Sequence, residues 1–177
     1  MATLTLTLNK DNITAAVKAD TYIAGLIDKA TDPVKLAAYG YNEQAGDDAF
    51  HEVKLYRTLR AGVAKFSVAM SEYVDTSQTS ASISNTLNKQ SPFFNIQMTV
   101  GSRFNQAFKD VLATLAEEYI INSMLYSWWQ SINIERSKQF LIFMDETMDS
   151  VKKCLAKSAP QVTENSYTNP TGAFANS

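Results

Sequence analysis

Residues 133–155, NIERSKQFLIFMDETMDSVKKCL, carry the pattern that decides the fold. Apolar or small side chains recur there at alternating steps of three and four through three heptads; they are Ile134, Ser137, Leu141, Met144, Met148, Val151 and Leu155. This spacing is typical of a helix that packs along the seam of a bundle. Asn133 stands before the pattern, where its side chain can cap the first turn. The segment therefore predicts a helix that requires partner helices.

Further helical segments are available within the same chain. Residues 11–30, 47–74 and 104–132 each repeat apolar side chains at helical spacing. Residues 32–40 begin with Asp-Pro and end at a glycine, which predicts a short additional helix. The fold class is therefore mainly α, a helical bundle of four to five helices.

Two places in the chain alternate with the period of a strand. Thr3 to Leu8 places Leu4, Leu6 and Leu8 on one face of a short N-terminal strand. Residues 81–87 and 94–100 alternate as well, and a turn-forming segment separates them. We expect these two runs to form a β-hairpin arm, which spans about residues 76–103.

Length and charge limit the possible classes of protein. A chain of 177 residues with 45% hydrophobic residues fits one helical domain, residues 1–157, followed by an extended C-terminal tail, residues 158–177. The net charge of -2 argues against sequence-specific nucleic-acid binding. The N-terminus lacks the pattern of an export signal, and no apolar run approaches membrane-spanning length. We expect synthesis in the cytoplasm and no membrane partner.

The candidates for catalysis are weak. His51 is the only histidine, so neither a zinc-protease motif nor a di-iron carboxylate ligand set can be completed. His51 is better explained as a helix-end residue. Cys154 follows Lys152 and Lys153, whose charges can lower a thiol pKa, and a thiol catalyst would require it to meet His51 in space. The glycines are scattered singly and form no phosphate-binding loop. We expect no catalytic residue, cofactor or metal site.

The arm and the tail are unusually poor in charge. Twelve of the seventeen residues from Thr76 to Pro92 are Ser, Thr, Asn or Gln, and Glu164 is the only charged residue of the tail. Together with the N-terminal strand, these segments present groups that a neighbouring subunit can cover by strand addition or wrapping. The candidate interface residues are Leu4, Leu6, Leu8, Ile83, Leu87, Phe93, Phe94, Ile96, Trp128, Tyr167 and Phe174.

The helices add two further surface candidates. Lys54, Arg57, Arg60 and Lys65 follow the second long helix, and they form either a solvated face or a docking face for an acidic partner. Adjacent tryptophans point to different sides of a helix, so one of Trp128 and Trp129 is expected in the core and the other at an interface. We assign Trp129 to the core.

This layout resembles the head-to-tail connector, or neck adaptor, proteins of tailed bacteriophages. The resemblance lies in the helices at 11–74 and 104–157, in the uncharged run from Thr76 to Leu87 and in the end from Tyr167 to Phe174. It implies a homo-oligomeric ring subunit that docks on portal or neighbouring ring proteins and resides in the virion after cytoplasmic assembly. No residue motif carries the resemblance, so it implies no site residue.

Two alternatives belong to other functional classes. A cytoplasmic adaptor would grip one partner protein with its arm and form a defined heterocomplex. A helical enzyme or small-ligand-binding bundle would line a pocket with aromatic side chains, namely Tyr119, Tyr126, Trp128, Phe140 and Phe143.

Overall fold

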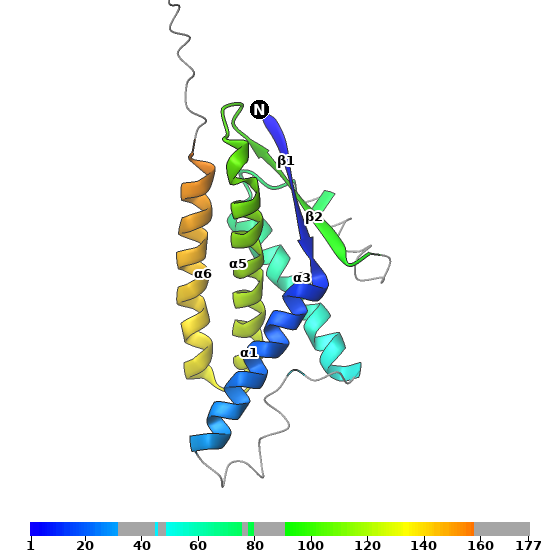
Figure 1. Ribbon diagram of the computed structural model, residues 1–177, viewed down its shortest axis with the longest axis vertical. Coiled ribbons are helices and arrows are strands. Elements are labelled where there is room, and N and C mark those ends of the chain that lie inside the picture. Colours follow the sequence, from blue (N-terminus) through cyan, green and yellow to red (C-terminus); the bar gives the residue numbers. More distant parts are fainter. Residues whose placement is uncertain (32–44, 46–48, 76–77, 80–90, 158–177) are drawn as a thin grey trace, which may run out of the picture.

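The computed structural model describes residues 1–31, 45, 49–75, 78–79 and 91–157 (Figure 1). Within these ranges the chain forms two strands, four long helices and one short 3-10 turn. In chain order they are β1 (Ala2–Asn9), α1 (Lys10–Thr31), α3 (Ala49–Ala69), β2 (Phe93–Val100), η1 (Gln106–Phe108), α5 (Lys109–Trp129) and α6 (Ile134–Leu155). The expectation of a mainly helical bundle with an N-terminal strand is confirmed. The predicted short helix at residues 32–40 lies outside the described residues.

Helix α5 is the central element of the bundle. Helices α6, α3 and α1 all pack on it, and so does strand β1 (Figure 1). Its sequence explains this position, because buried side chains occur all around its circumference in the second half, where Ile120, Met124 and Leu125 are fully buried. A helix that is apolar on every side is stable only when other elements surround it.

The two strands form one antiparallel sheet in which Leu4 faces Met98, Leu6 faces Ile96 and Leu8 faces Phe94. Strand β2 thus pairs with the N-terminal strand. The other run of the expected hairpin, residues 81–87, lies outside the described residues. The predicted alternation of buried and outward side chains along Thr3–Leu8 and residues 94–100 is confirmed. Every second residue of both strands points into the core, and the intervening residues form the outer face of the sheet.

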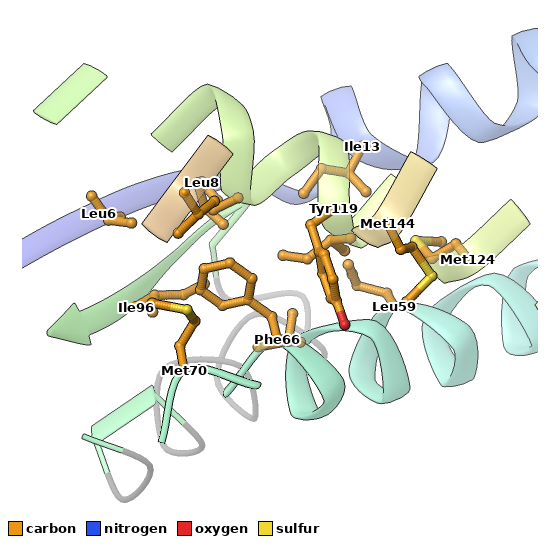
Figure 2. Packing of buried hydrophobic residues seen from close by; sticks show 14 of the residues in the cluster. Leu6, Leu8, Ile13, Leu59, Phe66, Met70, Ile96, Tyr119, Met124 and Met144 are labelled. Atoms are coloured by element: carbon orange, nitrogen blue, oxygen red, sulfur yellow. The ribbon is translucent and has the colours of Figure 1, made fainter. Parts of the chain in front are cut away.

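One continuous core joins the sheet to the helices (Figure 2). Phe66 of α3 packs edge-on against Tyr119 of α5, with 5.5 Å between ring centroids. Gly62 lets these two helices approach closely, since a β-carbon there would lie 3.3 Å from Ile120. Leu6, Leu8 and Ile96 extend the core beneath the sheet (Figure 2).

Helix α6 begins where the sequence predicts. Asn133 is its N-cap, and its side-chain oxygen accepts a hydrogen bond of 3.0 Å from the backbone N–H of Arg136. The buried face differs from the predicted heptad, because Ile134 and Leu141 are exposed. The residues that face the bundle are Ser137, Met144, Thr147, Met148, Val151 and Cys154. In a straight helix, positions seven residues apart are offset by about 20° around the axis. Over three heptads this offset rotates the first predicted positions, Ile134 and Leu141, out of the contact with the bundle.

Candidate functional site

The outer edge of β1 carries backbone groups that point away from the sheet. On the far side of β2, the N–H of Thr99 donates to the carbonyl of Tyr73 at 2.6 Å, and the N–H of Asp75 donates to the carbonyl of Gln97 at 2.8 Å. Gln97 and Thr99 therefore direct their backbone groups away from β1. In an antiparallel pair, the β1 residues directly opposite them then direct their own N–H and C=O groups away from β2.

The register makes these opposite residues Thr5 and Thr3. Two positions further along, Thr7 continues the same alternation. The N–H and C=O groups of Thr3, Thr5 and Thr7 consequently line the outer edge of β1. Leu4, Leu6 and Leu8 instead use their backbone groups to bond β2 and their side chains to fill the core.

Little in the described part of the chain protects this edge. No further strand pairs with β1 among the described residues. Only its end is occupied, where the N–H of Asn9 donates to Oε1 of Glu117 at 3.2 Å. Natural edge strands are usually protected by charges, prolines or bulges. Strand β1 contains no charged residue and no proline, so its own sequence provides neither of these protections.

The outer face of the sheet is polar and uncharged. Its hydroxyl and amide side chains come from Thr3, Thr5, Thr7, Asn9, Asn95, Gln97 and Thr99. Thr7 donates a hydrogen bond of 3.0 Å to Oδ1 of Asn95 across the two strands. Phe93, which is 51% exposed, is the large apolar side chain at this face. Sequence reasoning assigned the leucines to the interface and overlooked the threonines, although both follow from the same alternation.

The structure corrects most of the predicted interface residues. Those that lie in the core of this single chain are Leu4, Leu6, Leu8, Phe94, Ile96 and Trp128. Their side chains need no neighbouring subunit for cover, because the sheet packs on the helices of its own chain. Phe93 stays a candidate. The other predicted positions, Ile83, Leu87, Tyr167 and Phe174, lie outside the described residues.

Both tryptophans are core residues, which corrects the assignment of Trp128 to an interface. The ring of His51 meets Trp128 edge-on at 5.4 Å between centroids, and Nζ of Lys54 lies 4.0 Å from the centroid of the same indole. Nζ of Lys65 lies 5.0 Å from the ring of Tyr126. Such cation–π contacts hold the ammonium groups over the aromatic faces of α5. Burial lowers the pKa of Lys54 and of Lys65.

The two candidate groups for thiol chemistry are far from each other. His51 lies in the first turn of α3 and Cys154 near the end of α6, and these ends lie on opposite sides of the molecule (Figure 1). Burial raises the pKa of the Cys154 thiol, and the nearby charge of Lys157 opposes this rise. A buried, protonated thiol is a weak nucleophile. The arrangement does not support thiol catalysis.

The rings named for the alternative of an aromatic pocket contact different neighbours. Tyr119 packs on Phe66, Trp128 contacts His51 and Lys54, and Phe140 pairs with Phe143 on α6. Among the described residues, no group of three or more His, Cys, Asp or Glu side chains is arranged to hold a metal ion.

The comparisons with known proteins name no relative. No known protein family, no curated protein and no solved structure matches the chain. In the described part of the chain, no helix combines the length and the apolar character needed to cross a membrane.

Proposed function

We propose that the chain is a non-enzymatic assembly subunit that forms a homo-oligomer and accepts an added strand along β1. The observation that carries this proposal is the uncharged edge at Thr3, Thr5 and Thr7, which no other described strand covers and which stands on a well-packed core. An incoming strand can bond to three N–H and three C=O groups there. Each such hydrogen bond contributes about 1 kcal/mol net.

The proposed setting is the neck of a tailed-bacteriophage virion, where the chain would be a head-to-tail connector or adaptor ring subunit. The support for this finer assignment is the layout of a helical bundle, an N-terminal strand and two long segments that are poor in charge. Other virion or assembly proteins, such as a portal, would be its further partners. In a ring, modest contacts repeat around the axis and together give a stable assembly.

Substitution of proline for Thr5 tests the use of this edge. The N–H of Thr5 points outward, so proline removes a donor from the edge without removing a hydrogen bond to β2. Thr5→Val is the matched control, because valine keeps the N–H and the branched shape. Sedimentation velocity should show the same oligomer for the wild type and Thr5→Val, and smaller species for Thr5→Pro.

Circular dichroism and urea unfolding establish whether each variant is folded. Thr3→Pro repeats the test nearer the end of the strand, where a fixed proline φ disturbs the ladder less. If folded Thr5→Pro and Thr3→Pro both assemble as the wild type does, the edge is not the site of association.

A further inference from the structure

The outward faces of α3 and α6 lie on different sides of the molecule. Both helices pack on α5, which stands between them, and they share no extensive contact with each other (Figure 1). Both also run in the same direction, opposite to α5 (Figure 1). Helix α3 is inclined to α6 (Figure 1). A rotation of the molecule about an axis along the bundle can bring α3 of one copy across the outer face of α6 of the next copy, with the two helices running the same way.

The outward face of α3 is basic and apolar. Val53 is 67% exposed, and Arg57 and Arg60 are exposed one and two turns further on. The carboxylate within α3 is Glu52 in the first turn, and the rest of the helix carries none. Because Lys54 and Lys65 already lie over aromatic rings, Arg57 and Arg60 are the cations that project from this face.

The outward face of α6 is acidic and apolar. Ile142 is 58% exposed, and Asp145, Glu146 and Asp149 are exposed on the next two turns. No lysine or arginine occurs between Lys138 and Lys152. The two faces are thus complementary in charge, and each also exposes a branched apolar side chain.

The spacing of these groups matches as well. Val53, Arg57 and Arg60 follow one another at steps of four and three residues, and Ile142, Glu146 and Asp149 follow at the same steps. These residues span only about two turns of each helix. Where the two helices cross while running the same way, one register therefore places Val53 on Ile142, Arg57 on Glu146 and Arg60 on Asp149. Arginine and carboxylate groups form the best-matched ion pairs.

We infer that α3 of one copy of this chain docks on α6 of the next copy in this register. The contact is head-to-tail, since it joins two different surfaces, and it closes into a ring when the rotation from one subunit to the next divides a full turn. This inference rests on the proposed assembly function and supplies the lateral interface between subunits. It does not use the β1 edge, where the added strand makes a second contact of the same assembly.

Charge reversal on each face, followed by mixing, tests the inference in the full chain. Arg57→Glu/Arg60→Glu places two acidic faces against each other, and Glu146→Lys/Asp149→Lys places two basic faces against each other. Like charges oppose association, so each variant alone should lose at least about tenfold in apparent affinity between subunits. A mixture should assemble again, because each reversed face then meets an opposite charge.

Sedimentation velocity with a fluorescent label on one variant measures this co-assembly. The expected result is a large species that contains both variants in the mixture and is absent from either variant alone. Glu72→Lys/Glu118→Lys is the control, because it changes the net charge as much as the α6 reversal does, at exposed positions outside the proposed register. This control should assemble like the wild type.

Three outcomes would overturn the inference. The first is that both reversal variants are folded, by circular dichroism, and still assemble alone with wild-type affinity. The second is that the mixture fails to assemble although each variant is folded. The third is that the control loses assembly as the reversals do. If the wild type forms an oligomer that Thr5→Pro dissolves and the reversals leave intact, the helix interface fails and the proposed function stands. A monomeric wild type overturns both.

Discussion

Leu6→Asp tests which side chains of β1 point into the core. The proposed use of the outer edge of β1 depends on this orientation of the strand. Leu6 is fully buried beneath the sheet, whereas Thr5 lies on the polar outer face. Loss of the buried leucine costs about 1.5–3 kcal/mol. An unpaired carboxyl group in the same place adds about 1–3 kcal/mol, even when it is protonated.

Ionisation makes the substitution more costly at neutral pH. Burial raises the pKa of a carboxyl group, in extreme cases by about 3–5 units, and each unit corresponds to about 1.4 kcal/mol. The folded-state pKa of the new aspartate is then above its unfolded value. The protein therefore loses further stability as pH rises from the unfolded pKa, near 4, towards the folded pKa. The total at pH 7 approaches the whole stability of a typical domain, about 5–15 kcal/mol.

Urea unfolding followed by circular dichroism measures this effect at a fixed protein concentration. Leu6→Asp should be strongly destabilised at pH 7 and less so near pH 4. Thr5→Asp should cost about 1 kcal/mol or less, because its side chain points away from the core. Equal losses for the two variants, or a loss for Leu6→Asp that does not change with pH, would refute the assigned facing.

Three further predictions concern the bundle. Asn133→Ala removes the cap of α6 and should cost about 1 kcal/mol of stability. Calorimetry should then show a fall in Tm of about 2–4 °C, and an unchanged Tm would contradict a stabilising role of this cap. Gly62→Val should cost about 1–3 kcal/mol in urea unfolding because its side chain meets Ile120, whereas exposed Ala61→Val should not. The raised pKa of Cys154 keeps the native thiol protonated, so its contribution to stability is complete below the unfolded pKa and is lost as pH rises through the folded pKa. Iodoacetamide at pH 8 should therefore react about tenfold more slowly with native than with unfolded protein, and equal rates would contradict burial.

The helices were predictable from the sequence because their signals are local. Apolar spacing and the cap at Asn133 lie within a few residues of the structure that they determine. The pairing of β1 with β2 is different, since it joins segments that are far apart in the chain. Alternation shows which residues share a face of a strand. It does not show which other strand lies beside it.

The candidate interface was predicted less well for a related reason. An apolar face of a strand has the same pattern whether its own chain or another subunit covers it, and Leu6 proved to be covered by its own chain. The outward direction of the Thr5 backbone depends on the bonds that Tyr73 and Asp75 make to the far side of β2. No sequence signal specifies those bonds. The absence of charge in β1, by contrast, was visible from the start.

The mass of the purified, untagged chain in solution tests the central claim most directly. Light scattering at increasing protein concentration and low salt should give a mass of several times 19.6 kDa, consistent with a ring of identical subunits. A mass of 19.6 kDa at every concentration would contradict the claim that this protein is a self-assembling subunit.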